Sequence, residues 1–157
     1  MRIAIGSDHH GVTLKARIKD ALEGTGLRGA AAHTCVDFGA HAGASVDYPD
    51  FARPVAEGVA SGAFDRGILI CSNGIGMSIA ANKVPGVRAA LVHHPDDAQQ
   101  CREHNDANVV TLAGRALPPE LALDIVNTFL LTPFAGGRHE RRVAKITDLE
   151  QRSEGSA

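Results

Sequence analysis

Residues 67–83, GILICSNGIGMSIAANK, decide the fold of this chain. The stretch opens with an apolar run over 68–70, which is short enough for a fully buried strand, and Cys71 closes that run. Small residues then occupy 72–76, before a helical pattern over 77–83. We therefore predict a buried strand, a glycine-rich turn and the first turns of a helix.

The predicted turn has the properties of an anion-binding site. Its glycines let the backbone approach a ligand closely, and the first N–H groups of the helix have no partner within the helix. The helix dipole adds positive potential, which favours an anion, a developing oxyanion or the thiolate form of Cys71. The stretch thus indicates a reactive cysteine beside an oxyanion cradle. A cysteine that only packs at the end of a core strand is the alternative.

Known nucleotide-binding motifs do not match this turn. Gly74-Ile75-Gly76 lacks the third glycine of the dinucleotide fingerprint, and no Gly-Lys-Ser/Thr sequence follows as in a P-loop. A flavodoxin-like nucleotide binder is therefore a weak alternative, and we expect no cofactor.

The composition indicates one domain with a substantial core. The chain has 157 residues, 44% of them hydrophobic, and its formal charge of −2 provides no basic field for nucleic acid. Its beginning meets polar residues too soon for a signal peptide, and no apolar run is long enough to cross a membrane. Three cysteines without a Cys-x-x-Cys pair favour a reducing compartment. We predict a cytoplasmic protein that binds neither nucleic acid nor membranes.

Strand-like and helix-like segments alternate along the chain. Strands are predicted over 2–6, 34–38, 68–70, 87–92 and 107–113. Helices are predicted over 12–23, 48–61, 77–83, 95–104, 118–131 and 138–152. One domain would span 1–152, with 153–157 as a disordered tail. The alternation predicts a Rossmann-like, doubly wound five-stranded parallel sheet in an α/β/α sandwich, with an extra C-terminal helix.

Several polar residues follow directly after predicted strands. Asp8 and His9 come after the first strand, Cys71 after the third, and His93-His94 after the fourth. Ligands of doubly wound sheets bind beyond the carboxyl ends of the strands. We therefore expect these residues to contribute to one site.

The extra helix carries an unusual charge arrangement. Arg138, Arg141 and Arg142 cluster at its start, where the helix dipole favours acidic residues, and Arg138 and Arg142 share a face at i and i+4. A phosphate held by two guanidinium groups would balance this charge, although a solvated charged surface is the simpler alternative. We infer that the helix packs on a partner subunit and carries the arginines to a site.

The remaining candidates are histidines, a tyrosine and two cysteines. The eight histidines lack the spacing of a metal site, so we expect no metal. His104 suits a proton donor, since histidine titrates near neutral pH, or only a favourable charge at a helix C-terminus. Tyr48 suits a packing anchor as well as a ligand contact. Cys35, within a strand, and Cys101, within a helix, are predicted to be structural.

Five motifs together resemble one enzyme family. They are IAIGSDHHG over 3–11, VDYPDFA over 46–52, LICSNGIGMSIAANK over 69–83, EHNDANVVTLAGR over 103–115 and GGRHERR over 136–142. In this order they are similar to the type B ribose-5-phosphate isomerases, a family that includes galactose-6-phosphate isomerase subunits. The resemblance spans 1–152 and implies a metal-free aldose–ketose isomerase. It also implies a homodimer, or a dimer of dimers, whose sites each draw on two chains and bind a small sugar phosphate.

The resemblance implies a role for each motif residue. Cys71 would be the base that moves a proton between C1 and C2 through a cis-enediolate, and His104 of the neighbouring chain would be the acid that opens the furanose ring. Backbone N–H groups over 72–76 would hold the enediolate oxygen, Asp8 a sugar hydroxyl or the ring oxygen, and His9 the phosphate. The implied substrate-binding residues are Asp8, His9, Tyr48, Ser72, Asn73, Gly74, Gly76, Asn105, Arg115, Arg138 and Arg142.

The chain departs from the family's usual pattern at a few positions. Ser72-Asn73 stand where Gly-Thr or Gly-Ser is common, which together with the loop over 39–47 bears on substrate preference. His10 replaces an apolar residue, and no role for it is predicted. Some relatives use a glutamate base where Met77 stands here, and a thioether cannot act as a base. The favoured reaction interconverts ribose 5-phosphate and ribulose 5-phosphate. The alternatives are an isomerase of a hexose 6-phosphate or a tetrose phosphate, and a non-catalytic sugar-phosphate-binding protein.

Overall fold

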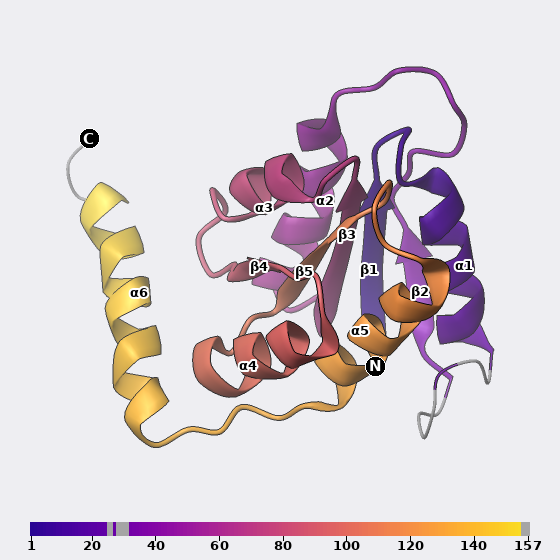
Figure 1. Ribbon diagram of the computed structural model, residues 1–157. Helices are drawn as coiled ribbons and strands as arrows, with labels where there is room; N and C mark the ends of the chain where they lie inside the picture. Colours follow the sequence, from indigo (N-terminus) through magenta and orange to yellow (C-terminus); the bar gives the residue numbers. More distant parts are fainter. Residues whose placement is uncertain (25–26, 28–31, 155–157) are drawn as a thin grey trace.

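The computed structural model describes residues 1–24, 27 and 32–154 of the chain. Within them, five parallel strands form one sheet: β1 (Arg2–Ser7), β2 (Thr34–Asp37), β3 (Arg66–Cys71), β4 (Ala89–Leu91) and β5 (Val109–Ala113). The helices are α1 (Val12–Glu23), α2 (Tyr48–Ala60), α3 (Ile75–Ala81), α4 (Pro95–Asn105), α5 (Pro119–Leu131) and α6 (Arg138–Glu154). The strand order β2-β1-β3-β5-β4 places β3 at the centre of the sheet (Figure 1). The predicted doubly wound α/β fold with an extra helix is confirmed.

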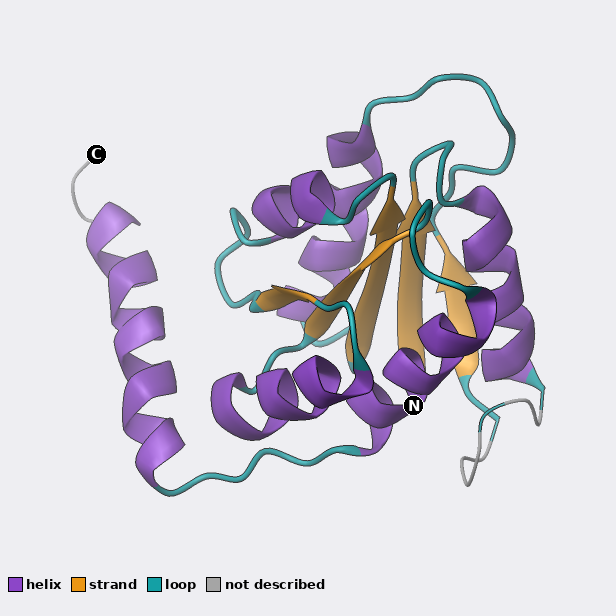
Figure 2. Cartoon of the chain, viewed as in Figure 1, coloured by secondary structure: helices purple, strands orange, loops and turns teal. Residues whose placement is uncertain are grey.

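Alternate residues of the strands face two separate helical layers. Ile5 and Ile70 pack with residues of α1, α4 and α5 in one hydrophobic cluster. Leu69 and Cys71 pack with residues of α2 and α3 in a second cluster. Helices thus cover both faces of the sheet (Figure 2). Because both faces of a parallel sheet are covered, the central strands β1, β3 and β5 are buried along nearly their whole length, as the apolar run over 68–70 predicted.

Most elements differ from their predicted bounds by one to three residues, and three of them are informative. α3 begins at Ile75 rather than 77, because Gly74 adopts a φ of 76° and turns the chain directly from the strand end into the helix. β4 covers three residues rather than 87–92, since this edge strand pairs only with β5. α6 continues to Glu154, two residues past its predicted end. Residues 155–157 of the predicted tail lie outside the described residues.

The last helix stands apart from the sheet. A connection over 132–137 leads from α5 to α6, which runs beside α4 at the edge of the molecule (Figure 1). α6 is tied to the body by the carboxylate of Glu150, which accepts a hydrogen bond from the N–H of Gly86 at 2.9 Å. Leu149 remains 66% exposed. None of the described helices is both long enough and apolar enough to cross a membrane.

Candidate active site

The carboxyl ends of the central strands meet at one edge of the sheet. The register pairs Ser7 of β1 with Ile70 of β3, and Cys71 of β3 with Ala113 of β5. Asp8 follows β1 directly, and its N–H donates to the carbonyl of Ile70 at 3.0 Å. The sheet therefore brings Asp8 and Cys71 to the same edge. We refer to the predicted site residues located here (Asp8, His9, Tyr48, 71–76 and Arg115) as the carboxyl-edge group.

The thiol of Cys71 lies against the glycine-rich turn. The residue is buried, and the N–H of Gly74 donates to its Sγ at 3.2 Å. The side-chain oxygen of Asn73 accepts the N–H of Ile75 at 3.1 Å. The N–H groups of Ser72 and Asn73 donate to no other group among the described residues and remain available to a ligand. The turn thus places the Cys71 thiol beside backbone donors that have no partner among the described residues.

Gly74 fits this turn because it has no side chain. A methyl group there would lie 2.5 Å from Cδ1 of Leu91 and 3.1 Å from the backbone carbon of Leu112. Its positive φ adds a backbone conformation that other residues rarely adopt. The glycine therefore allows both the close packing and the donation of its N–H to the sulfur.

Tyr48 and Arg115 border the same turn from other elements. A Cβ on Gly76 would lie 2.7 Å from the ring of Tyr48, so the ring sits directly on that glycine. The backbone N–H of Arg115 donates to the carbonyl of Ser72 at 3.2 Å, and the Arg115 side chain is exposed. The structure therefore brings both predicted residues to the cysteine turn.

Backbone donors hold Asp8 and His9. Oδ1 of Asp8 accepts hydrogen bonds from the N–H groups of His10 at 2.9 Å and Gly11 at 3.2 Å, which closes the turn before α1. Nδ1 of His9 accepts the N–H of Val46 at 3.3 Å. A ring nitrogen that accepts a hydrogen bond carries no proton, so neutral His9 is protonated on Nε2 and can donate from there. His10 packs its ring on His9, with 4.0 Å between the ring centroids.

A buried ion pair that the sequence analysis missed anchors the loop over 39–47. Nζ of Lys15 lies 2.5 Å from Oδ1 of Asp37 and donates to the carbonyl of Ala40 at 2.8 Å. Lys15 is 2% exposed, and the pair joins α1 to the end of β2. A lysine on the apolar face of the helix predicted over 12–23 was the available signal. The loop beside Asp8 and His9 is thus fixed at its base.

A second set of predicted site residues lies on α4 and α6. His104 and Asn105 end α4, and Arg138 and Arg142 lie exposed in the first turns of α6. The ring of His104 stacks on the ring of His139, with 4.3 Å between centroids and 8° between planes. We refer to these five residues as the helix group.

His139 is the member of the helix group whose surroundings shift its pKa. Burial, followed by the positive charges of His104, Arg138 and Arg142, lowers the pKa of His139, while Glu103 acts in the opposite direction. His139 is therefore neutral at pH 7. The described residues contain no cluster of three or more side chains suited to hold a metal ion.

Cys35, Cys101 and the pair His93-His94 are the remaining candidates from the sequence, and a site role for the pair stays a prediction. Burial raises the pKa of Cys35 to about 12 and that of Cys101 to about 11, so both thiols stay protonated. The backbone N–H groups of His93 and His94 donate to Oδ2 of Asp97 at 3.3 Å, at the start of α4. The pair follows β4 as predicted, and both residues are exposed.

The fold keeps the two groups apart within one chain. α4 leads into the amino end of β5, whereas Cys71 pairs with Ala113 at the carboxyl end of that strand. β5 has five residues, so its ends are about 13 Å apart. The end of α4, which carries His104, therefore lies toward the opposite edge of the sheet from the end of β3, which carries Cys71. Figure 1 shows the start of α6 on the same side as the end of α4.

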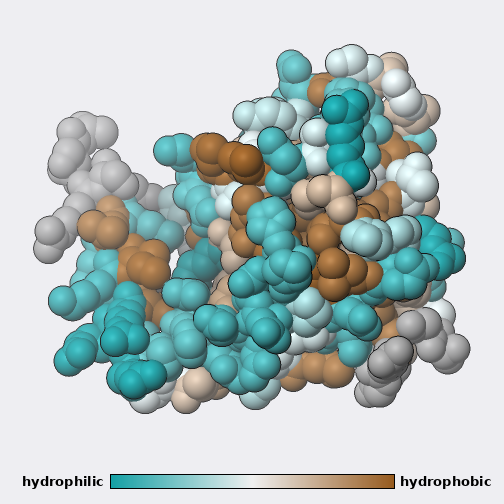
Figure 3. Space-filling view, viewed as in Figure 1, coloured by the Kyte–Doolittle hydropathy of each residue, from teal (hydrophilic) through white to brown (hydrophobic). Residues whose placement is uncertain are grey.

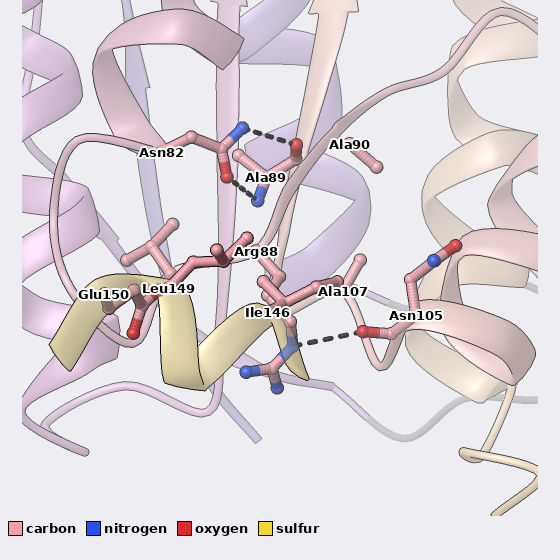
Figure 4. Close-up of a pocket in the computed structure, with 10 residues that line it drawn as sticks. Asn82, Arg88, Ala89, Ala90, Asn105, Ala107, Ile146, Leu149 and Glu150 are labelled. Carbon is pink, nitrogen blue, oxygen red and sulfur yellow. Dashed lines mark hydrogen bonds between the residues drawn. The ribbon is translucent and has the colours of Figure 1, made fainter. Parts of the chain in front are cut away.

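Two surface grooves lie near the exposed apolar residues. One, of about 480 Å³, separates α6 from the β4 edge and is lined by Asn82, Val87, Arg88, Ala89, Ala90, Asn105, Ala107, Ile146, Leu149 and Glu150 (Figure 4). The other, of about 520 Å³, lies between α2 and α3 and includes Tyr48 and Ile79. Figure 3 shows apolar side chains on α6 and, across the hollow, over α3. Neither groove is lined by Cys71.

Comparison with known proteins shows the same architecture. Residues 3–146 match the family described as Ribose/Galactose Isomerase. A solved structure of ribose-5-phosphate isomerase B from Clostridium thermocellum is 52% identical, with a TM-score of 0.92 over 98% of this chain and 99% of that chain.

Two curated bacterial proteins are similar over nearly their whole lengths. The ribose-5-phosphate isomerase B of Escherichia coli is 44% identical over 151 residues, which cover 96% of this chain and 97% of that protein. The D-erythrulose-4-phosphate isomerase of Pectobacterium atrosepticum is 41% identical over 147 residues, or 93% of each chain. Proteins with different named substrates thus share this sequence pattern.

Proposed function

Because the chain belongs to the ribose/galactose isomerase family, we propose that this aldose–ketose isomerase interconverts ribose 5-phosphate and ribulose 5-phosphate. The observation that carries the proposal is the buried Sγ of Cys71 beside the N–H of Gly74 at 3.2 Å and the free N–H groups of Ser72 and Asn73. Sugar-phosphate isomerisation requires this pairing of a base with oxyanion donors.

The proposed proton transfer takes place on one face of the sugar. The thiolate of Cys71 removes the proton from C2 of the open-chain aldose, and the electron pair moves onto the C1 carbonyl oxygen to form a cis-enediolate. The N–H groups of Ser72 and Asn73 support the negative oxygen. Return of the proton to C1, with transfer of the hydroxyl proton from O2 to O1, gives the ketose. No metal is required in this scheme.

Ring opening precedes this transfer, because ribose 5-phosphate is mainly a furanose. In the proposal, protonated His104 gives its proton to the ring oxygen as the C1–O4 bond breaks, and the C1 hydroxyl releases its proton to solvent as C1=O forms. Asp8 lies at the carboxyl edge with Oδ1 occupied by two backbone donors. Its Oδ2 has no hydrogen bond from another described residue and would accept one from a sugar hydroxyl.

We propose that each site is completed by a second chain. His104 and Cys71 lie toward opposite edges of the sheet, so one chain cannot place both on one sugar. Ile79 on α3 is 58% exposed and Leu149 on α6 is 66% exposed, so each of these helices presents an apolar side chain that a partner could cover. A homodimer, or a dimer of dimers, would cover these faces and carry His104, Asn105, Arg138 and Arg142 to the partner's Cys71 turn.

The phosphate would bind between the two chains. His9 can donate from Nε2, and Arg115 projects from the turn after β5 on the same chain. Arg138 and Arg142 would approach from the partner and would explain the positive charge at the start of α6. Binding the remote phosphate supplies energy that positions C1 and C2.

The comparisons also favour a second substrate class. One relative is named for a four-carbon ketose phosphate, and the family description names galactose as well as ribose. The loop over 39–47, held by Lys15 at its base and by His9 at Val46, borders the sugar site and would limit substrate length. Measurement of kcat/KM across aldose phosphates of four to six carbons decides the matter, and a clear hexose or tetrose preference would overturn the pentose proposal.

The proposal predicts a metal-independent reaction that needs Cys71. We expect ribulose 5-phosphate to form from ribose 5-phosphate at the same rate with and without chelator, and Cys71→Ala to reduce kcat by about 10³-fold. Cys101→Ala, which alters a buried thiol of α4, is the matched control and should stay within about threefold of wild type. Inhibition by chelator, or an active Cys71→Ala variant, would contradict the mechanism.

We also propose that the protein acts in the cytoplasm. Its three cysteines are free, which suits a reducing compartment.

A further inference from the structure

His139 is the one member of the helix group to which the proposed function gives no role. It lies in the first turn of α6, and its ring is parallel to that of His104 at the end of α4, within 8° and 4.3 Å. The two histidines come from different helices and are 35 positions apart in the chain (139 minus 104). The stack is therefore a tertiary contact and not a consequence of helix geometry.

The stack is the contact that defines the plane of the His104 ring. The backbone holds both residues, since the N–H of His139 donates to the carbonyl of Gly136 at 3.1 Å and His104 lies within the last turn of α4. The ring torsion of a histidine is broad, so backbone position alone does not set the ring plane. Among the described residues, no hydrogen bond holds either nitrogen of His104. Both nitrogens are thus left for a substrate.

His139 differs from a surface histidine in its surroundings. It is 7% exposed, and its Nδ1 has no hydrogen-bond partner among the described residues. Burial and the charges of His104, Arg138 and Arg142 lower the pKa of His139, with Glu103 of α4 opposing them. A neutral ring tolerates a protonated imidazole above it, whereas two stacked cations would repel. The site therefore permits His104 to carry the acidic proton.

We infer that His139 is a positioning residue, whose flat ring holds the imidazole of His104 in the plane from which it protonates the furanose ring oxygen. The inference rests on the proposed function, because it assumes that His104 opens the ring. It assigns to α6 a second task besides carrying Arg138 and Arg142, namely orienting the acid that ends α4.

Separate changes in kcat and KM provide a readout that a merely structural role would not give. The arginines and His9, which are proposed to bind the phosphate, do not depend on the plane of the His104 ring, so binding is kept while ring opening slows. We expect His139→Leu to lower kcat from ribose 5-phosphate about tenfold with KM nearly unchanged. Because an enzyme cannot alter the equilibrium between the two pentose phosphates, kcat/KM from ribulose 5-phosphate should fall by the same factor.

His139→Phe is the matched variant, since it keeps a flat ring without a titrating group. It should restore the rate from ribose 5-phosphate to within about threefold of wild type. Equal losses in the Leu and Phe variants, or a rise in KM in place of the fall in kcat, would overturn the inference. A His139→Leu variant as active as wild type would overturn it while leaving the proposed function standing. A wild type inactive on both pentose phosphates would instead overturn the proposed function.

A spectroscopic measurement covers the case in which His139→Leu fails to assemble. The ring protons of His104 should show an upfield ring-current shift in wild type and in His139→Phe, relative to a free imidazole. Values of a free imidazole in both proteins would overturn the stacked arrangement, and with it the inference. Sedimentation of each variant verifies that its assembly state equals that of wild type.

Discussion

The carboxyl-edge group and the helix group are built by different physical means. Around Cys71 the contacts are short and backbone-made: the N–H of Gly74 reaches Sγ, that of Arg115 reaches the carbonyl of Ser72, and the register of β3 with β5 positions them. Around His104 the contacts are made by side chains of two helices, and Arg138 and Arg142 are exposed.

The difference indicates which group serves proton transfer and which serves phosphate binding in the proposed reaction. The sheet holds the thiol and its donors with little freedom, which suits the transfer of a proton between adjacent carbons. The long arginine side chains lie on a helix that stands apart from the sheet. They can bind the phosphate of a substrate at the Cys71 turn only when that helix is held next to the turn. In the proposal the partner chain does so, and each group is then half of a site.

Subunit mixing gives the largest expected effect on this comparison. Cys71→Ala and His104→Ala should each be nearly inactive on ribose 5-phosphate. After exchange, each mixed dimer would contain one site with both residues intact and one site with neither. About half of the dimers would be mixed, and each would have one working site of two. The mixture should therefore recover about a quarter of wild-type activity.

The controls for this experiment concern exchange itself. Mass spectrometry under native conditions should detect mixed dimers before the assay. Mixing two preparations of Cys71→Ala should yield nothing. Mixed dimers without recovered activity would mean that the two residues act within one chain, and the division proposed here would then be wrong.

Gly74→Ala tests the rigid side of the comparison. The added methyl would meet Cδ1 of Leu91 at 2.5 Å in a backbone with φ of 76°. We expect a loss of about 1–3 kcal/mol in the free energy of unfolding. Displacement of the donors should lower kcat by about 100-fold.

Gly43→Ala is the matched control for this change. Gly43 lies in the loop over 39–47, and a Cβ there has no atom within 4 Å. Its stability and kcat should stay near wild-type values. Chemical denaturation measures the free energy of unfolding of both variants, and steady-state kinetics measures their kcat. A Gly74→Ala variant with normal kcat would show that the turn tolerates displacement.

Arg142→Gln tests the helix group, whose arginines are exposed, and should weaken substrate binding more than it slows turnover. Removal of a charge-assisted contact to phosphate should raise KM for ribose 5-phosphate by about 10- to 30-fold, with a smaller change in kcat. Arg141→Gln is the control, because Arg141 neighbours Arg142 but does not share the face that Arg138 and Arg142 form. Equal increases of KM in both variants would indicate that the arginines act through their general positive electrostatic field and not through a direct phosphate contact.

The order of strands and helices could be predicted from the sequence because its signals are local. The apolar run over 68–70 and Gly74 define the turn at Cys71, and strand ends in a parallel sheet meet at one edge. Thus Asp8, Tyr48 and Arg115 are found beside the cysteine turn.

Contacts between distant segments could not be predicted in this way. The pairing of Lys15 with Asp37 and the stacking of His139 on His104 depend on how helices pack, which periodicity does not encode. Both residues had a weak signal: a lysine on an apolar face, and a histidine within an arginine-rich motif. Neither signal specifies a partner.

The smallest expected effect concerns the hydrogen bond between Val46 and His9, which joins the loop over 39–47 to the carboxyl-edge group. Val46→Pro removes the N–H that donates to Nδ1 at 3.3 Å, so that Nδ1 no longer needs to be the unprotonated nitrogen. The proton would then be shared between the two ring nitrogens, and donation from Nε2 to phosphate would weaken. We expect KM to rise about three- to fivefold with kcat unchanged.

Val46→Ala keeps the N–H while removing most of the side chain, so it should leave KM within about twofold of wild type. The ¹⁵N chemical shifts of the His9 ring report the tautomer directly, and they should show Nε2–H in wild type and in Val46→Ala, but a mixture in Val46→Pro. If the shifts change and KM does not, His9 makes no phosphate contact, and binding rests on the arginines of the helix group together with Arg115. If KM rises equally in both variants, loop packing rather than the tautomer carries the effect. The carboxyl-edge group would then be less rigid than its backbone contacts indicate.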